Sequence, residues 1–368
     1  ISAEAEDPEV IILRSQNLHD MEFPASLAAV GRAGAGTNNI PVNTLSERGI
    51  PVFNTPGANA NAVKELSIAS LLLAARNICD AHEYVKALDE TGEALNTAVE
   101  AGKKQFVGFE LPGRTIGVVG LGAVGVEVAN AALALGMNVI GFDPNITVRS
   151  AWRLSAGVEH AESIEELFKR SNAVSLHVPL IDATKGLVNA KRLGLMPQGS
   201  VLINFARGGI VDVAAALEAL DDGRLLSYVC DFPTPELIAH PKVVALPHLG
   251  ASTAEAEENC AVTVVENLRD FMENGNIRFS VNFPESRLPR LDAWRITIAN
   301  ANVPNMVGQI STCLAEAGLN IEDLLNKSIG ELAYTIVDVN GPVSDETCEK
   351  IRAIDGVLTL RNLGKPVT

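Results

Sequence analysis

TIGVVGLGAVGVEVANAALALGMNVIGFD, residues 115–143, is the stretch of sequence that decides the fold. Its apolar, β-branched start at 115–119 predicts a buried strand, and the glycines that follow lead into a helical pattern that ends at Gly136. A second apolar run, at 138–142, ends on Asp143. This order predicts a strand, a helix and a parallel strand, which is the repeating unit of a doubly wound α/β sheet.

The spacing of Gly120, Gly122 and Gly125 predicts a dinucleotide site at the turn between this strand and this helix. The first glycine permits the tight turn, the second lets the backbone approach a pyrophosphate, and the third allows close packing of the helix on the strand. The helix start offers free N–H groups to the phosphates. Asp143 can accept hydrogen bonds from a ribose 2′-hydroxyl, which favours NAD over NADP. The alternative is a glycine-rich turn that binds nothing, and the complete order of strand, glycines, helix, strand and acid disfavours it.

Composition bounds the class of protein. The 368 residues suffice for two or three domains, and a formal net charge of −16 disfavours a non-specific nucleic-acid or anionic-membrane binder. The five cysteines are scattered without metal-ligand spacing, which is typical of reduced thiols in a cytoplasmic protein and predicts no metal site. The most apolar stretch, 66–75, is too short to span a bilayer.

Four further apolar runs, at 173–178, 201–206, 225–232 and 243–246, predict strands that bring the sheet to about six. Ligands of doubly wound sheets bind beyond the carboxyl ends of the strands. The residues that immediately follow each run are therefore the first candidates for function.

An arginine, a glutamate and a histidine follow three of these runs: Arg207, Glu236 and His248. Arg207 can hold a carboxylate in its planar fork, and His248 can take a hydroxyl proton as hydride leaves the adjacent carbon. Glu236 can orient the imidazole. Singly, each could be a loop anchor or a solvated surface group. Together with the glycine turn, they predict hydride transfer from a 2-hydroxy acid to a nicotinamide.

The remaining sequence predicts two smaller α/β parts. Before the glycine turn, strands are expected at 9–13, 27–30 and 50–53, a long helix at 62–88 with Asn61 as its N-cap, and a crossover at 89–110. After the last strand of the sheet we expect a helix at 255–272 and a linker at 275–292. From Arg295 on, the order strand, helix, strand, strand, helix, strand predicts a ferredoxin-like βαββαβ domain.

Several motifs together resemble the D-isomer-specific 2-hydroxyacid dehydrogenases: the glycine turn with Asp143, NFARGGIVD at 204–212, Asp231 with Glu236 five residues on, and PHLGAST at 247–253. Within that family, GRAGAGTNNI at 31–40 and VFNTPGANANAV at 52–63 are most similar to the members that oxidise D-3-phosphoglycerate in serine synthesis. The resemblance extends from about Val10 to the C-terminus. The family's first strand and helix need roughly twenty residues more than precede Pro8, so we expect that unit to be incomplete here.

The resemblance implies roles for individual residues. Arg207, Glu236 and His248 would be catalytic. NAD would contact Gly120, Gly122, Ala123, Val124, Gly125, Asp143, Pro144, His177, Pro179, Ala206, Arg207, Asp231, His248 and Gly250, with Asp231 at the nicotinamide amide. Substrate would contact Arg14, Ser15, Arg32, Ala35, Gly36, Asn59, Asn61 and Arg207. Arg14 and Arg32 would lie near its phosphate. His177 and the two N-terminal arginines could instead have structural roles.

The resemblance also implies an architecture. A Rossmann sheet at 89–253 would be inserted in a smaller flavodoxin-like α/β substrate domain formed by 1–88 and 254–285. Residues 295–368 would form an ACT regulatory domain, where Asn302 and Asn320 match positions of a serine effector site and Asn300, a third candidate, replaces the histidine often found nearby. The alternative for this domain is a role in subunit contact alone. A homo-oligomer, dimer or tetramer, is expected.

Two alternative functions stay open at this point. The chain could oxidise another D-2-hydroxy acid, such as glycerate or lactate. It could also be an NADH-sensing co-regulator, against which the presence of all three candidate catalytic residues argues.

Overall fold

The computed structural model describes residues 5–366, and their contacts form two compact units. One unit is the continuous segment Asn59–Ala256, and the other combines the residues up to Ala58 with those from Glu257 on. The three predicted domains and their boundaries remain a prediction. Each unit is described by itself below.

The continuous unit is built on a parallel sheet that has seven strands among the described residues, in the order β10-β9-β8-β7-β4-β5-β6. These strands are β4 (Thr115–Val119), β5 (Asn138–Phe142), β6 (Val158–His160), β7 (Ala173–Leu176), β8 (Ser200–Asn204), β9 (Leu225–Cys230) and β10 (Val243–Ala245). The predicted doubly wound fold is confirmed, and the first two strands have the predicted bounds. The prediction of about six strands missed β6, because its three residues lie at the sheet edge, with two of them exposed and none fully buried.

Helices cover both faces of this sheet. They are α2 (Ala60–Ala75), α3 (Ile78–Lys86), α4 (Gly92–Gly102), α5 (Ala123–Ala134), α6 (Val148–Arg153), α7 (Ile164–Arg170), α8 (Ala190–Leu193), α9 (Val213–Asp221) and α10 (Pro235–Ala239), with short 3-10 turns at Lys103–Phe106 and Gly208–Ile210. Residues of α2 and α5 pack in one apolar core, and residues of α7, α8 and α9 pack in another.

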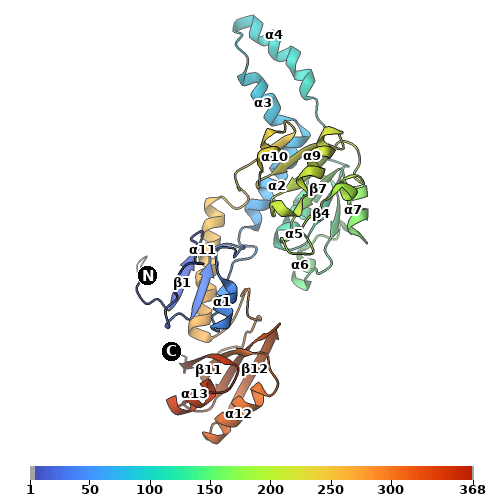
Figure 1. The fold of residues 1–368 in the computed structure, drawn as a ribbon. Coiled ribbons are helices and arrows are strands. Elements are labelled where there is room, and N and C mark those ends of the chain that lie inside the picture. The colour runs from blue at the N-terminus through green and yellow to red at the C-terminus, as the bar shows by residue number, and fades with distance from the viewer. Residues whose placement is uncertain (1–4, 367–368) are drawn as a thin grey trace. The chain divides into compact units, whose positions relative to one another are not determined.

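The predicted single helix at 62–88 is wrong in two respects. Helix α2 begins at Ala60 with Asn59, not Asn61, as its N-cap. The helix also breaks before α3, because Asn77 adopts the left-handed conformation with φ 49°. Beyond this break α3 and α4 extend away from the sheet (Figure 1), and α3 buries none of its residues.

The second unit contains a parallel sheet of three described strands, β1 (Val10–Leu13), β2 (Ala29–Arg32) and β3 (Val52–Phe53). Its helices are α1 (Val42–Glu47) and the long α11 (Ala254–Asn274), whose first residues belong to the other unit. A Cβ on Gly31 of β2 would lie 2.5 Å from Leu268 and 2.6 Å from Val264. Glycine at this position therefore allows α11 to pack directly on the strand.

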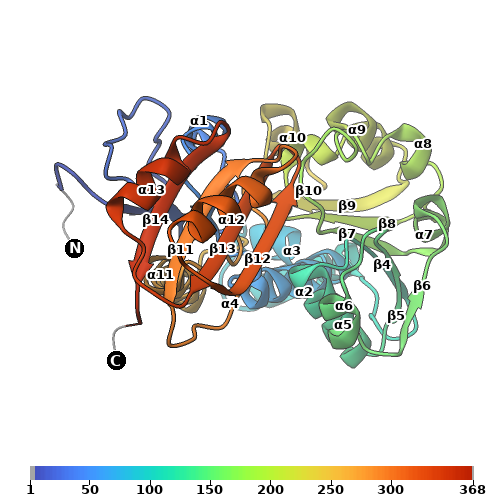
Figure 2. The same cartoon turned by 90° about the horizontal axis from the view of Figure 1, so that it is seen from below.

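The C-terminal part of this unit is an antiparallel sheet of four described strands in the order β12-β13-β11-β14. Its elements are β11 (Trp294–Ala301), α12 (Met306–Glu316), β12 (Ile321–Ile329), β13 (Leu332–Val339), α13 (Asp345–Arg352) and β14 (Val357–Gly364). The two helices lie on one face of the sheet (Figure 2). The predicted ferredoxin-like order of elements is confirmed.

The segment 275–292, predicted as a linker, is instead part of a core. Ile277 and Phe283 are buried, and the Asn282 side chain accepts from the Val52 N–H and donates to the Ile50 carbonyl. The Phe283 ring packs against Tyr334 of β13. The prolines and mixed charges of the segment are typical of a linker, and the segment contains only a few apolar residues that indicate a core. As a result, both sheets of this unit share one apolar core.

A buried ion pair closes this shared core. Arg295 of β11 and Asp338 of β13 are almost fully buried and form two hydrogen bonds of 2.6 Å. The guanidinium also donates to the carbonyls of Asn274, Leu288 and Pro289. The pair therefore ties the C-terminal sheet to the end of α11 and to the segment that follows it.

Removing the carboxylate should destabilise this unit strongly. We expect Asp338→Ala to cost about 3–5 kcal/mol of the free energy of unfolding, because Arg295 is then left buried and unpaired. Denaturant unfolding measures this loss. The control is Glu346→Ala, which removes an exposed ion pair with Lys350 and should change stability little. Equal losses in the two variants would contradict the role given to the buried pair.

Candidate active site

The glycine turn after β4 has the geometry that a dinucleotide needs. Gly120 has φ +91°, and a Cβ there would lie 2.7 Å from the carbonyl oxygen of His177. A Cβ on Gly125 would lie 1.8 Å from the Gly120 carbonyl, so only glycine lets α5 approach the strand end. At Gly122 a Cβ would meet nothing within 4 Å. The backbone of this residue is therefore open to a ligand at the start of α5.

Asp143 follows β5 directly and holds the glycine turn. One carboxylate oxygen accepts the Leu121 N–H at 2.8 Å, and the other accepts the Asn145 N–H at 2.9 Å. Both oxygens keep a lone pair for a further donor such as a ribose hydroxyl. The acid therefore stands where the sequence predicted it, beside the turn.

His177 lies at the end of β7. Its Nε2 is 2.8 Å from the Ser175 hydroxyl, and desolvation lowers the pKa of His177 to about 4. The imidazole is thus neutral at pH 7. This pairing suits a structural role as well as a contact with the cofactor.

Arg207 and His248 come together around one aromatic ring. The ring of Phe232 lies 4.5 Å from the His248 ring, centroid to centroid, and the Arg207 Cζ lies 5.7 Å from the Phe232 centroid. All three residues follow the carboxyl ends of neighbouring strands β8, β9 and β10. Topology therefore places a cationic side chain and a proton acceptor at one edge of the sheet.

Asp231 holds the histidine loop and keeps one free oxygen. The residue is 1% exposed, its carbonyl accepts the His248 N–H at 3.1 Å, and its Oδ2 accepts the Gly250 N–H at 3.0 Å. Its Oδ1 is buried without a partner among the described residues. Burial raises the pKa of Asp231, opposed by the Gly250 hydrogen bond and by the charges of His248 and Arg207. An unpaired buried acceptor fits a nicotinamide amide, which can donate to it.

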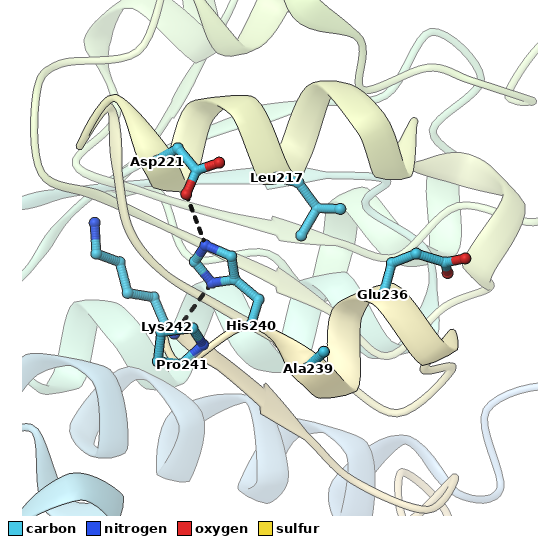
Figure 3. Close-up of a pocket in the computed structure, with 7 residues that line it drawn as sticks. All are labelled: Leu217, Asp221, Glu236, Ala239, His240, Pro241 and Lys242. Carbon is cyan, nitrogen blue, oxygen red and sulfur yellow. Dashed lines mark hydrogen bonds and ion pairs between the residues drawn. The ribbon is translucent and has the colours of Figure 1, made fainter.

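The structure does not place Glu236 beside His248. Thr234 caps α10, Pro235 occupies its first turn, and Glu236 stands exposed on that helix. A hydrogen bond from Thr234 lowers the pKa of Glu236. Figure 3 shows its carboxylate pointing away from His240, at the rim of a shallow depression of about 370 Å³ between α9 and α10.

The candidate substrate residues fall in both units. In the discontinuous unit, Arg14 forms an ion pair of 2.9 Å with Glu257, and the Arg32 Nε donates to the Arg14 carbonyl at 3.0 Å. The carbonyl of Ala35, next to Gly36, accepts from the Asn54 side chain. In the continuous unit, Asn59 occupies the N-cap position of α2 without a side-chain capping bond, and Asn61 accepts a hydrogen bond from Lys64 at 2.6 Å. Two cationic side chains thus lie near the carboxyl ends of β1 and β2. Arg14 directly follows β1, and Arg32 is the last residue of β2.

The candidate effector residues are not brought together within one chain. Asn302 donates to the Gly330 carbonyl at the turn between β12 and β13. Asn320 exchanges hydrogen bonds with Asn340 beyond the opposite end of β13. The eight residues of this strand separate the two positions by about 25 Å. Asn300 is buried and donates to the Ala301 carbonyl. One small ligand cannot contact both Asn302 and Asn320 in a single copy.

Residues 68–250 match the NAD binding domain of the D-isomer specific 2-hydroxyacid dehydrogenases. Over 358 residues the chain is 33% identical to the D-3-phosphoglycerate dehydrogenase of Haemophilus influenzae, covering 93% of this chain and 83% of that one. The chain belongs to the D-isomer-specific 2-hydroxyacid dehydrogenase family. Over 350 residues it is 32% identical to the Escherichia coli D-3-phosphoglycerate dehydrogenase, covering 92% of this chain and 82% of that one.

A solved structure gives the same assignment. The NAD⁺-bound 3-phosphoglycerate dehydrogenase of Entamoeba histolytica superposes with a TM-score of 0.60 at 28% identity, covering 75% of this chain and 83% of that one. The sequence predictions of the family, of an NAD-dependent dehydrogenase and of NAD as cofactor are confirmed. The individual residue roles remain predictions.

Two absences hold for the part of the chain that the structure describes. No group of three or more His, Cys, Asp or Glu residues within 5–366 could hold a metal ion. No helix of these residues is both long and apolar enough to cross a membrane.

Sequence reasoning missed Phe232. No periodicity marks it, and its importance comes from its contacts with residues of two other loops. The available signal was its place directly after Asp231, at the end of a predicted strand.

The glycine turn gives a test with two matched variants. Gly122→Ala should leave thermal unfolding nearly unchanged and weaken NADH binding at least tenfold, because the new methyl group would occupy the path of the pyrophosphate. Gly125→Ala should lower the unfolding temperature, because its Cβ would collide with the Gly120 carbonyl. Thermal unfolding and fluorescence titration with NADH measure both effects. Unweakened binding in Gly122→Ala would contradict a pyrophosphate at this turn.

Proposed function

We propose that this chain oxidises the 2-hydroxyl of D-3-phosphoglycerate to the ketone of 3-phosphohydroxypyruvate with NAD⁺, the first step of L-serine synthesis. The observation that carries the proposal is the gathering of Arg207 and His248 at the strand edge beside the half-satisfied carboxylate of Asp231. The names of the curated relatives support the same substrate.

The residues that would hold NAD are those of the glycine turn, Asp143 and Asp231. The open backbone at Gly122 and the start of α5 suit the pyrophosphate, Asp143 suits the adenosine ribose, and the free Oδ1 of Asp231 suits the nicotinamide amide. Bound NAD⁺ would supply the hydride acceptor. The protein groups supply orientation and the proton acceptor.

Two residues would act on the carboxylate and the hydroxyl group of the substrate. Arg207 holds the carboxylate of the hydroxy acid through paired hydrogen bonds and stays charged throughout. His248 accepts the hydroxyl proton as the C–H bond is broken, so that one proton and one hydride leave the substrate together. The predicted support of His248 by Glu236 would need a movement of α10, on which the Glu236 side chain is exposed. The residues Arg14 and Arg32 would pair with the substrate phosphate.

The substrate choice has a direct test. The wild-type protein should form NADH from D-3-phosphoglycerate at alkaline pH, and Arg14→Ala and Arg32→Ala should each raise its KM at least tenfold more than that for D-glycerate. Each variant removes a positive charge proposed to pair with the substrate phosphate, which D-glycerate lacks. Steady-state absorbance kinetics measure both constants. Equal effects on the two acids would favour an unphosphorylated substrate, and no NADH formation with any 2-hydroxy acid would favour an NADH-sensing protein.

We further propose that the chain is a homo-oligomer of the cytoplasm. The segment α3–α4 exposes Ile78, Val85 and Val99 while extending from the sheet, which suits a contact with a second copy. All five cysteines are free of disulfides in the described residues, as suits a reducing compartment.

L-Serine is the proposed effector of the C-terminal domain. Because Asn302 and Asn320 lie at opposite ends of β13, a serine that contacts both must lie between two copies of this domain. We expect L-serine to bind at millimolar concentration or below, and Asn302→Ala or Asn320→Ala to abolish binding equally. Calorimetry with the whole oligomer measures this. Absence of heat with the wild-type protein would restrict the domain to subunit contact.

A further inference from the structure

We propose that Phe232 is a positioning residue that holds the side chains of His248 and Arg207 in their reactive orientation. The inference rests on the proposed function, because it assigns to Phe232 a part in the same hydride transfer. Its basis is that one ring contacts both functional side chains, at 4.5 Å for the His248 ring and 5.7 Å for the Arg207 Cζ.

His248 needs an external support. It is exposed, and its φ of +51° lies in the left-handed region, which residues other than glycine adopt uncommonly. Its N–H donates to the carbonyls of Asp231 and Leu246, both at 3.1 Å. These bonds fix the backbone and leave the side-chain torsions free. Within residues 5–366, no hydrogen bond restrains an imidazole nitrogen of His248, and the ring of Phe232 packs against the imidazole.

Phe232 is itself fixed by the sheet. It directly follows Asp231, the buried acid beyond the end of β9, and precedes Pro233, which restricts its backbone to extended conformations. Gly208, which follows Arg207, makes room for it, because a Cβ there would lie 3.2 Å from the Cβ of Phe232. The backbone and Cβ of Phe232 are therefore held in place, and the ring that they carry lies between the two functional side chains.

The ring also suits the charges beside it. An aromatic face attracts cations, which here are the Arg207 guanidinium and the imidazolium formed once His248 takes a proton. The ring carries no exchangeable proton, so it cannot act in the reaction itself. It limits the rotamers of His248 and excludes water from one side of the imidazole. Without it we expect fewer bound substrates to meet a correctly oriented base, while NAD affinity is kept.

The first test separates positioning from stability. Phe232→Leu should lower kcat about tenfold or more, with the dissociation constant of NADH changed less than about twofold. Phe232→Tyr, which keeps the ring, should restore at least half of the lost kcat. The matched control is Phe109→Leu, since Phe109 packs under Arg114 at 4.0 Å outside the site. A kcat of Phe232→Leu equal to that of the control would overturn the proposal.

The second test asks whether Phe232 acts through His248. In a His248→Ala background, Phe232→Leu should lower the residual kcat clearly less than it does in the wild-type protein, because the His248 side chain is gone and only the placement of Arg207 is still affected. A full tenfold loss of kcat in the His248→Ala background would show that Phe232 does not act through His248, and it would overturn the proposal. Wild-type activity is measured first, and its absence would contradict the proposed function alone.

The third test needs no activity. The imidazole C–H proton signals of His248, assigned by their loss in His248→Ala, should carry a ring-current shift from Phe232. Phe232→Leu should remove this shift, and Phe232→Tyr and Phe109→Leu should keep it. Unmoved signals in Phe232→Leu would show that the two rings are not in contact in solution and would overturn the proposal.

Discussion

Asp231 has its carboxylate buried at the end of β9, with one oxygen bonded to the Gly250 N–H and the other without a partner among residues 5–366. A half-satisfied buried carboxylate is unfavourable for folding. Asp231 also fixes the loop that carries His248. Its backbone carbonyl accepts the His248 N–H, and its side chain accepts the Gly250 N–H. This loss of stability accompanies a loop of defined shape and leaves one buried acceptor unpaired, which the amide of the proposed nicotinamide would satisfy.

Much of the fold could be predicted because several local signals agreed. At 115–143 the β-branched runs, the glycines and the terminal acid all indicate one strand–helix–strand unit, and β4 and β5 match it residue for residue. Prediction failed where one signal stood alone. The sequence pattern of a helix runs through residues 76–77 without a break. In the structure the helix ends there because the backbone of Asn77 is left-handed. The segment 275–292 contains few apolar residues, yet those few fill a core built by distant strands.

The candidate site could be predicted as far as sheet geometry determines it. Arg207, Asp231 and His248 each follow a strand of one parallel sheet, so their strand ends meet at the same edge whatever the intervening helices do. Glu236 lies farther from its strand, and a threonine cap followed by proline starts a helix that turns it outward. The spacing from Asp231 alone does not reveal this, whereas the Thr234–Pro235 helix start does. The role of Phe232 depends on side-chain contacts between loops, which no pattern along one segment encodes.

The shared core of the discontinuous unit sets an order for folding on the ribosome. Phe53 of β3 packs against Phe271 of α11, and Phe271 packs in turn on Tyr334 of β13. One face of β1–β3 packs within residues 11–52, whereas the other face gains its partners only after α11 and β13 have been synthesised. The continuous unit Asn59–Ala256 is synthesised between these two parts of the shared core. In that interval the face of β2 and β3 that later meets α11 and β13 has no apolar partner, which makes it a site where a chaperone could bind during translation.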